Sequence, residues 1–425
     1  MSVYPKPSEE LITVTIQFLP AFILGAITVI AVLCLIFRWS GLKKVRSFYV
    51  WLGALAITGG AWAFLFPLAI NADFSQNGDG AALRQMLIYT TGGVLGVITL
   101  GETHRKNNLE KDKNDQDHDR QVHTERRSRY TTAIEQLSNG DSATTRLGGV
   151  YSLVGLVDEW LADEKIIPNI KERRKKGQVI INNLCAYIRS PFPLAEQAEQ
   201  LDKPYAKDLQ NDFGGDKEKF DADKRSFARD KAALEEERQV RKSIIKEIRE
   251  RLQDIGAPGS WSKFDYDFSN ALFFYSTNFM FSHFDAFSNF HGVTFTQNAD
   301  FSGAKFTGDT DFSQAKFTGS ANFFGVEFTW YANFSGAKFT KKANFFEATF
   351  EEKPQFEYAL GDKTCKARFS CKADPKGYNF EVSDNSPYKI ETEEKEYDGV
   401  KFIIPKGTEL FDPDEPSAQE NNDDS

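Results

Sequence analysis

Residues 299–323 read ADFSGAKFTGDTDFSQAKFTGSANF, and the spacing of phenylalanine in this stretch specifies the architecture of the C-terminal part. Phe recurs at alternating steps of five and six residues, so the period is eleven, and a small residue usually stands two positions before each Phe. Self-similarity at a fixed period is the mark of a solenoid, in which each repeat stacks on its neighbours. The ladder runs without a gap through seventeen positions: Phe268, Phe273, Phe279, Phe284, Phe290, Phe295, Phe301, Phe306, Phe312, Phe317, Phe323, Phe328, Phe334, Phe339, Phe345, Phe350 and Phe356.

This spacing excludes the simple regular structures. Residues five and six apart lie on different faces of an α-helix, and one strand of this length is implausible because strands usually have about 3–10 residues. A chain that turns a corner every five or six residues fits the pattern, since each short side then directs one large and one small side chain inward. A four-sided coil would take 22 residues and give about four coils, whereas a two-sided coil of 11 residues would give about eight. The spacing leaves both shapes open.

The ladder also carries a more specific motif, which reads ADFSG at residues 299–303, AKFTG at 304–308 and ANFSG at 332–336. This motif resembles the repeat of pentapeptide-repeat proteins, in which a small residue and Asp or Asn precede a central Leu or Phe. The resemblance implies a right-handed quadrilateral β-helix and therefore favours the four-sided coil. The alternation of five and six residues departs from the strict step of five that is usual in the family.

The N-terminal part has the composition of a membrane domain. Residues 11–37 and 49–70 contain no charged residue and are long enough to span a bilayer, and residues 83–100 form a shorter third candidate. Lys and Arg concentrate in the first loop and after residue 100, which by the positive-inside rule places both regions in the cytoplasm. We therefore expect a multi-pass membrane protein whose soluble region is cytoplasmic, whereas with only two spans the solenoid would lie outside the cell.

The middle of the chain is charged and helix-favouring. Residues 129–137 (RYTTAIEQL) and 146–151 (RLGGVY) resemble the helical module that joins membrane spans to repeats in actinobacterial membrane pentapeptide-repeat proteins. The resemblance implies a bacterial cell membrane and the order span, stalk, module, solenoid. Further on, an apolar stripe from Val240 to Ile255 predicts a helix that docks on the first coil and caps its exposed edge.

The expected fold is therefore a set of N-terminal transmembrane α-helices and a small cytoplasmic α-helical module, followed by a β-solenoid with a C-terminal cap. The ladder stops after Phe356, and the last stretch has six acidic residues and no basic one, which is typical of disorder. The expected parts are a membrane domain of two or three transmembrane helices (1–101), a stalk and helical module (102–194), a charged helical linker and N-terminal solenoid cap (195–260), the β-helix (261–360), a C-terminal cap (361–411) and a disordered acidic tail (412–425).

We find no sequence signature of catalysis. The chain has no phosphate-binding glycine loop, no nucleophile elbow and no His/Cys cluster with metal-ligand spacing. Cys365 and Cys371 are separated by five residues and have no histidine nearby in the sequence, so we expect two free thiols. The sequence therefore predicts a protein that is not an enzyme, with no catalytic residue, metal, cofactor or small-molecule substrate.

Binding is the better-supported class of function. Residues directly after a ladder Phe should point outward, and a four-sided coil would bring exposed aromatic side chains together, which marks contact sites. We predict a membrane-tethered scaffold that contacts the lipid bilayer and an unknown protein partner, with a homo-oligomer as one form of that contact. The candidate partner surface is Met280, Phe281, Phe324, Trp330 and Phe346.

The alternative function is that of a DNA mimic, which regulates a topoisomerase such as gyrase. Residues 268–357 hold nine acids against six lysines, a weak excess for a mimic. The overall excess of acids (61 against 52 bases) argues against direct nucleic-acid binding.

Overall fold

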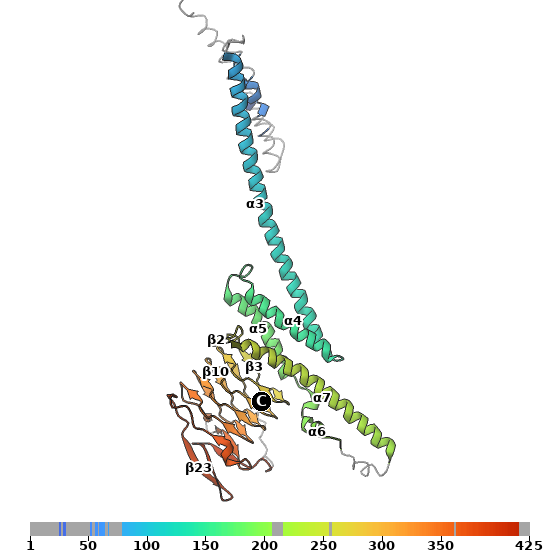
Figure 1. Ribbon diagram of the computed structural model, residues 1–425, viewed down its shortest axis with the longest axis vertical. Helices are drawn as coiled ribbons and strands as arrows, with labels where there is room; N and C mark the ends of the chain where they lie inside the picture. Colours follow the sequence, from blue (N-terminus) through green and yellow to red (C-terminus); the bar gives the residue numbers. More distant parts are fainter. Residues whose placement is uncertain are drawn as a thin grey trace, which may run out of the picture. The chain divides into compact units, whose positions relative to one another are not determined.

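The computed structural model describes residues 79–205, 216–254, 257–360 and 363–415, together with short helical pieces between residues 25 and 67. The chain divides into two compact units, Met1–Gln121 and Val122–Ser425, and each is described by itself. The long helix α3 (Asp79–Leu137) begins in the first unit and continues without a break into the second (Figure 1).

Helix α3 contains both the predicted third span and the predicted stalk. Within the described part of the chain, Gly80–Leu137 is the one helix that is long and apolar enough to cross a membrane, judged by length and composition. Several apolar side chains in its first part, including Met86, Val97 and Leu100, are exposed. The other two predicted spans, residues 11–37 and 49–70, lie outside the described residues except for the short helical pieces.

The second unit opens with a helical module built on the end of α3. An ion pair between Arg126 and Asp163 at 2.5 Å joins α3 to the residue that follows α4 (Ala143–Ala162). Ser142 caps the N-terminus of α4 and Asn169 that of α5 (Ile170–Arg189), where each side-chain oxygen accepts a hydrogen bond from a free backbone N–H group. The helical elements that follow α3 are α4 (Ala143–Ala162), α5 (Ile170–Arg189), η1 (Pro193–Ala195), α6 (Ala198–Asp202) and α7 (Lys217–Leu252).

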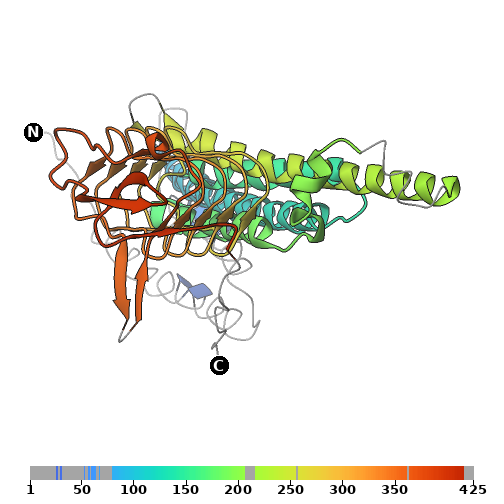
Figure 2. The ribbon, with the colours of Figure 1, turned by 90° about the horizontal axis from the view of Figure 1, so that it is seen from below.

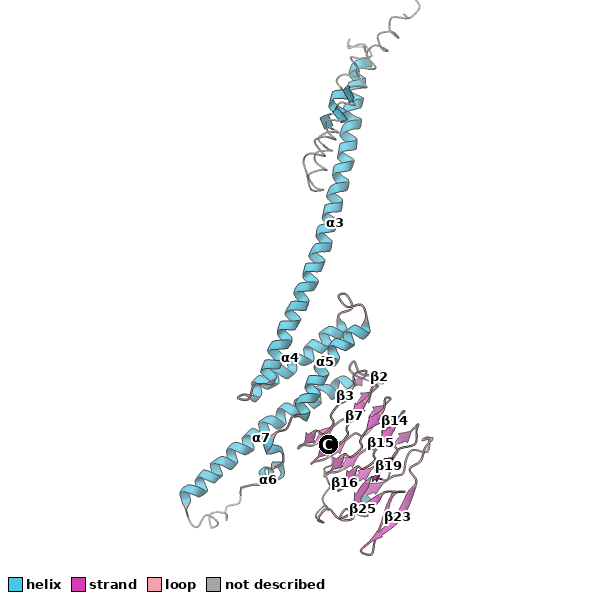
Figure 3. Ribbon diagram, turned by 180° about the vertical axis from the view of Figure 1, so that it is seen from behind, coloured by secondary structure: helices cyan, strands magenta, loops and turns pink. Residues whose placement is uncertain are grey.

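The solenoid is four-sided. Strands at equivalent positions in successive coils pair in parallel 22 residues apart, as Phe306 does with Phe284 and Phe328, which confirms the quadrilateral coil and excludes the two-sided one. Figures 1 and 3 show the short strands stacked along the solenoid, and Figure 2 shows its coils superposed. The four sheets are face 1, with β3 (Tyr266–Asp267), β7 (Ser288–Asn289), β11 (Thr310–Asp311) and β15 (Ala332–Asn333); face 2, with β4 (Leu272–Phe273), β8 (Thr294–Phe295), β12 (Lys316–Phe317), β16 (Lys338–Phe339), β21 (Arg368–Ser370) and β25 (Glu409–Phe411); face 3, with β5 (Thr277–Asn278), β9 (Ala299–Asp300), β13 (Ala321–Asn322), β17 (Ala343–Asn344) and β22 (Tyr378–Asn379); and face 4, with β6 (His283–Phe284), β10 (Lys305–Phe306), β14 (Glu327–Phe328) and β18 (Thr349–Phe350).

The phenylalanine ladder forms four columns of stacked rings inside the solenoid. All seventeen ladder residues are buried, and neighbouring rings in a column lie nearly parallel, as Phe301 and Phe323 do at 5.2 Å between centroids. Rings of the columns on the opposite faces 1 and 3 meet edge to face, as Phe312 and Phe323 do at 5.4 Å. Both arrangements are favoured by the aromatic quadrupole, so the core gains specific contacts beyond its apolar burial.

The alternation of five and six residues reflects two kinds of corner. In a five-residue step the carbonyl of one Phe accepts a hydrogen bond from the N–H three residues later, as Phe301 does from Ala304 at 2.9 Å. The second residue after the Phe then takes a left-handed backbone, as in a type II turn. The six-residue corners lack such a residue. The left-handed positions are Asn270, Phe281, Gly292, Gly303, Gln314, Gly325, Gly336 and Glu347.

Two glycines should therefore respond differently to alanine. Gly325 has φ +61°, and an added methyl group would meet only open space, so Gly325→Ala should cost about 1 kcal/mol from backbone strain. Gly319 lies in a six-residue corner where a Cβ would be 2.2 Å from the carbonyl carbon of Gln297 in the neighbouring coil, so Gly319→Ala should cost about 3 kcal/mol. Denaturant unfolding of the two variants measures this difference. Equal losses, or a larger loss at Gly325, would contradict the close stacking of the six-residue corners.

Helix α7 covers the first coil, as its apolar stripe predicts, and its buried residues include Val240, Ile244 and Leu252. A second helix shares this position. Helix α5 also packs there, since Gly177 approaches the ring of Phe264 so closely that a Cβ would lie 2.6 Å away. The helical module thus packs on the first coil beside α7, although the sequence analysis listed it as a part separate from the cap. Next to α7, β1 (Gln253–Asp254) pairs with β2 (Ala257–Pro258).

The ring columns continue beyond Phe356, although the periodic ladder stops there in the sequence. A hairpin of β19 (Glu357–Leu360) and β20 (Lys363–Lys366) interrupts the coil, after which Phe369 stacks on Phe339 at 5.0 Å and Phe380 on Phe345 at 5.7 Å. The insertion breaks the eleven-residue period but not the columns. The remaining elements of the cap are η3 (Pro375–Gly377) and a hairpin of β23 (Thr392–Tyr397) and β24 (Val400–Pro405).

The start of the acidic stretch is ordered, which differs from our prediction. Asp412 follows β25, pairs with Lys372 at 3.1 Å and accepts a hydrogen bond from the Asp414 N–H at 3.0 Å. These contacts hold residues 412–415 in a turn on the cap. The rest of the predicted disordered tail, residues 416–425, lies outside the described residues.

Candidate interaction surface

The corner between faces 3 and 4 brings three residues of the predicted partner surface into one column with Ser302. Met280, Ser302, Phe324 and Phe346 occupy the same position in successive coils, one residue after a ladder Phe. The rings of Phe324 and Phe346 lie 6.0 Å apart, with Phe324 45 % exposed and Phe346 half-buried. Met280 is half-buried, and its carbonyl accepts a hydrogen bond from the Gln253 side chain at the end of the N-terminal cap.

Phe281 extends this column of apolar groups. It takes a left-handed backbone at the corner, with φ 56°, and its ring is exposed to solvent on one side. On the other side the ring lies against the next coil, where a Cβ on Gly303 would come within 2.5 Å of it. Because Gly303 has no side chain, the Phe281 ring can pack directly on its backbone. Phe281 therefore supplies an aromatic side chain beside Ser302, the one position of the column without a large apolar group.

Trp330 does not lie on this edge. It stands at the next corner, between faces 4 and 1, and is 56 % exposed. Two further exposed aromatic residues, Phe287 and Tyr331, occupy this second edge, and both lie three residues after a ladder Phe. The expectation that the residue directly after each ladder Phe points outward does not include these two. In a six-residue step the third residue after the Phe is usually exposed as well. The alternation of five and six residues in the sequence marks which steps have this longer corner.

Face 4 between the two aromatic edges is polar. Its outward column is His283, Lys305, Glu327 and Thr349, and Lys305 pairs with Glu327 at 2.9 Å. Partial burial and the neighbouring Lys305 lower the pKa of His283, which favours a neutral imidazole at neutral pH. We call this arrangement the aromatic-edged face: face 4 with Phe281, Phe324 and Phe346 on one edge and Phe287, Trp330 and Tyr331 on the other.

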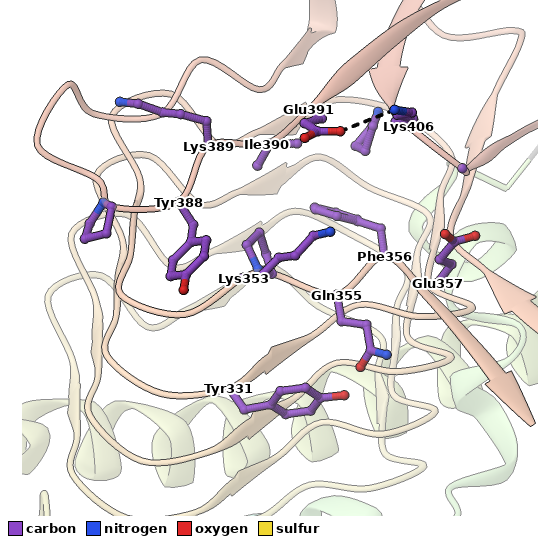
Figure 4. A pocket seen from close by; sticks show the side chains of 14 residues that line it. Tyr331, Lys353, Gln355, Phe356, Glu357, Tyr388, Lys389, Ile390, Glu391 and Lys406 are labelled. Carbon is purple, nitrogen blue, oxygen red and sulfur yellow. Dashed lines mark ion pairs between the residues drawn. The ribbon is translucent and has the colours of Figure 1, made fainter.

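A hollow in the C-terminal cap opens beside the second edge (Figure 4). Its volume is about 1000 Å³, and Tyr331 and Tyr388 lie on its wall with Lys353 between them. Glu391 and Lys406 form an ion pair of 3.5 Å across its rim. Because the hollow is wide and combines apolar and charged walls of both signs, it suits a segment of a partner protein better than a small ligand.

The polar groups of the solenoid do not form a catalytic relay. His291 Nδ1 lies 2.8 Å from Ser313 Oγ and 4.0 Å from an Asp311 carboxylate oxygen, so both partners approach the same ring nitrogen. A Ser-His-Asp relay needs the carboxylate and the hydroxyl on opposite nitrogens. This His-Ser contact therefore links two coils and has no nucleophilic geometry.

The described residues also offer no candidate site for metal or thiol chemistry. Among the residues that the structure describes, no three His, Cys, Asp or Glu side chains gather where they could hold a metal ion. Cys185, Cys365 and Cys371 are free, and burial raises the pKa of the Cys185 thiol to about 12. Burial and the nearby Asp412 also raise the pKa of Cys371, which keeps this thiol protonated and weakly nucleophilic.

A comparison with family models supports the architecture. Residues 290–329 and 301–349 match a model described as pentapeptide repeats (9 copies). No curated protein and no solved structure is similar enough to match. The matched residues lie inside the stacked coils, and their central Phe residues form the ring columns of the core. The solenoid of this chain is therefore a pentapeptide-repeat β-helix with phenylalanine at the centre of its repeats.

Proposed function

We propose that this protein is a non-enzymatic scaffold, tethered to a bacterial membrane, that binds a protein partner through the aromatic-edged face. The observation that carries the proposal is the set of exposed aromatic side chains along both edges of one sheet. Large aromatic side chains dominate the binding energy of many interfaces, since they bury much area and lose little conformational entropy. A pentapeptide-repeat solenoid suits such a role because its fold offers a rigid surface.

The rigidity has a specific source in the coils. Each corner is held to the next by backbone hydrogen bonds, such as the Gly325 N–H to the Phe346 carbonyl at 2.9 Å. The exposed rings therefore keep their spacing without a partner, and binding loses little entropy in ordering them. A partner would cover the polar column of face 4 while its own apolar groups contact the two edges. A second copy of this chain is one candidate for that partner.

Phe324 and Phe346 provide the test. We expect Phe324→Ser/Phe346→Ser to lower the free energy of unfolding by about 1–2 kcal/mol, since both rings are partly solvated already, and to weaken partner binding at least tenfold. Crosslinking in intact cells, followed by quantitative mass spectrometry, measures the partner captured by each variant.

Tyr151→Ser is the matched control, because Tyr151 is an equally exposed aromatic residue on α4. Its capture should equal that of the unaltered protein. Unchanged capture by the double Phe variant would refute the proposed surface. A large loss of stability would also count against it, since the rings would then be structural.

The proposed membrane topology has three spans, with the N-terminus outside and the solenoid in the cytoplasm. It is supported by the apolar part of α3 and by the Lys/Arg distribution around the predicted spans. In a cysteine-free background, Ser75→Cys should react with a membrane-impermeant maleimide in intact cells, whereas Glu420→Cys should react only after lysis. Labelling of position 420 in intact cells would place the solenoid outside.

Mimicry of DNA receives less support from the charge distribution. A DNA mimic needs a continuous acidic surface, but face 2 carries Lys316, Lys338 and Arg368 in register, and face 4 alternates Lys305 with Glu327. Capture of a topoisomerase in the crosslinking experiment would nevertheless favour mimicry over the scaffold.

A further inference from the structure

The sheet of face 1 ends at a free edge beside the C-terminal cap. Gln355 forms the last bridge of this face, to Asn333 in the coil below, whereas face 2 continues one coil further, to β25. Gln355 uses both of its own backbone groups for that bridge: its N–H donates to the Ala332 carbonyl at 3.0 Å, and its carbonyl accepts from the Phe334 N–H at 2.7 Å. A strand on the other side of Gln355 would therefore pair through the residues that flank it.

The two backbone groups that such a strand needs are unpaired. In each lower coil the N–H of the face 1 ladder Phe donates to the next coil, as Phe334 does to Gln355. The series ends at Phe356, whose N–H has no acceptor among the described residues, and the Pro354 carbonyl has no donor among them. Since a parallel bridge uses one such donor and one such acceptor, Pro354 and Phe356 offer both pairing positions for a further strand.

The hollow of the cap leaves room for this strand, because both Pro354 and Phe356 line it. The Lys406 N–H donates to the Glu391 carbonyl at 2.8 Å and closes the base of the β23–β24 hairpin on the opposite wall (Figure 4). Among the described strands, β23 pairs with β24 and with no strand of face 1. The chain thus turns away as a hairpin at the level where the next strand of face 1 would run.

The charged side chains of the hollow favour an acidic occupant. Lysines outnumber glutamates three to two in its lining, and Glu391 already pairs with Lys406 at 3.5 Å. Lys353 is exposed in the middle of the hollow and forms no ion pair with any residue that the structure describes (Figure 4). In a strand that bridges at Gln355, the side chain two positions earlier lies over Lys353, where a carboxylate would pair with the free ammonium group.

The side chain of Gln355 indicates the chemistry of the bridging residue itself. Outward amides and carboxylates form ladders between coils, in which the upper amide donates to the lower oxygen, as Asn289 Nδ2 does to Asp267 Oδ1 at 3.1 Å. At the end of this column Gln355 Oε1 is buried and has no hydrogen-bond partner in the described part of the chain. An Asn in the next strand would supply the missing donor, since the cost of an unpaired buried oxygen is then removed.

We propose that an extended acidic segment of the partner protein adds to face 1 as its sixth strand and fills the hollow. This inference rests on the proposed function, because Tyr331 belongs both to the second edge of the aromatic-edged face and to the wall of the hollow. The bridging residue of the segment donates its N–H to Pro354 and accepts from Phe356, and its acidic side chain pairs with Lys353. In strand addition of this kind, main-chain bonds supply affinity and the side chains supply specificity.

Face 3 provides an internal control for this inference. Its series of ladder donors ends in the same way at Phe380, whose N–H has no acceptor among the described residues. The hollow beside Phe380 has the opposite charge, with Glu381 and Asp384 in its lining and Lys389 as its one lysine. An acidic strand is repelled there, so the same backbone edge should select the segment on face 1 and reject it on face 3.

A blocked heptapeptide of sequence GDANVSG is the probe for the purified full chain in detergent. Its Asn is the bridging residue, and its Asp then lies over Lys353. We expect its Kd to be about fivefold lower, or better, than that of the control peptide GKANVSG, because one charge pair changes from attractive to repulsive. Lys353→Glu should reverse this preference. A preference that stays the same in Lys353→Glu, or no binding of GDANVSG, would overturn the inference.

Residue-resolved hydrogen exchange tests the backbone pairing. Bound GDANVSG should slow exchange of the Phe356 amide in proportion to its occupancy and leave the Phe380 amide unchanged. Binding without protection of Phe356 would overturn strand addition, and so would protection that rises with protein concentration in the absence of peptide, which would assign the edge to a second copy. Phe324→Ser/Phe346→Ser should bind the peptide normally, so failure of the strand site and failure of the aromatic-edged face give different results.

Discussion

Replacing Phe323 with Asp is expected to unfold the solenoid. The ring of Phe323 is fully buried and stacks between Phe301 at 5.2 Å and Phe345 at 4.8 Å. Loss of a buried Phe side chain costs about 3–5 kcal/mol, and an unpaired carboxylate in this dry column adds several more. The sum is comparable to the whole stability of a typical domain, about 5–15 kcal/mol.

Phe324→Asp is the matched control for this prediction, since the next residue along the chain is the same type but lies on the exposed corner. Limited proteolysis and near-UV circular dichroism should show rapid cleavage within residues 261–411 and loss of the aromatic signal for Phe323→Asp. The Phe324 variant should keep both properties close to those of the unaltered protein. Retained protease resistance in Phe323→Asp would contradict a dry aromatic core, and Phe312→Asp should repeat the result.

Replacing Arg241 with Ala is expected to lower the free energy of unfolding by about 3–5 kcal/mol and to loosen the N-terminal cap. The guanidinium is buried where α5, α7 and the first coil meet, and it donates to the carbonyls of Ile188 and Ser190, each at 2.7 Å. It also pairs with Glu237 at 2.7 Å and lies over the ring of Phe274. Without it, two carbonyls lose a donor, and the largely buried Glu237 carboxylate keeps only the Tyr187 hydroxyl at 2.9 Å and Arg146 at 3.7 Å as partners.

Two experiments check where the Arg241→Ala variant loosens and how much the charge of Glu237 contributes to its loss of stability. Chemical denaturation gives the loss of stability, and proteolysis of Arg241→Ala should begin after α5, near residues 190–195. Adding Glu237→Gln should recover part of the loss, because a buried carboxylate that has lost its closest cation is then neutralised. Arg229→Ala, at a 76 % exposed position of the same helix, should change stability by less than about 0.5 kcal/mol. Equal losses at Arg229 and Arg241 would argue against the buried network.

Part of the fold was predictable because its physics is local and periodic. An inward-pointing Phe at each side of the coil recurs wherever the period recurs, so the ladder predicts the core from spacing alone. The same logic failed once the period was interrupted. Phe369 and Phe380 continue two of the columns, but the β19–β20 hairpin separates them from Phe356 by an irregular number of residues. An insertion that loops out of a coil leaves its packing intact and removes the periodic signal.

The candidate surface was predictable only in part. The residue after each ladder Phe was expected to point outward, but burial at that position ranges from Ser302, which is buried, to Phe324, which is exposed. Side-chain size and the residue stacked above decide this, and neither follows from the spacing. The second aromatic edge, with Phe287 and Tyr331, depends on how a six-residue corner displays its extra residue.

Periodicity and composition were enough to predict the solenoid, its four ring columns once the family resemblance was added, and the apolar character of the first part of α3. These properties repeat or accumulate along the chain, so no long-range contact is needed to infer them. Three other features emerge from the fold: α5 shares the cap with α7, the coils continue beyond Phe356, and the free edge of face 1 borders a hollow of the C-terminal cap. Each depends on contacts between residues far apart in the chain, and such contacts are set by the packing of whole elements rather than by any local pattern.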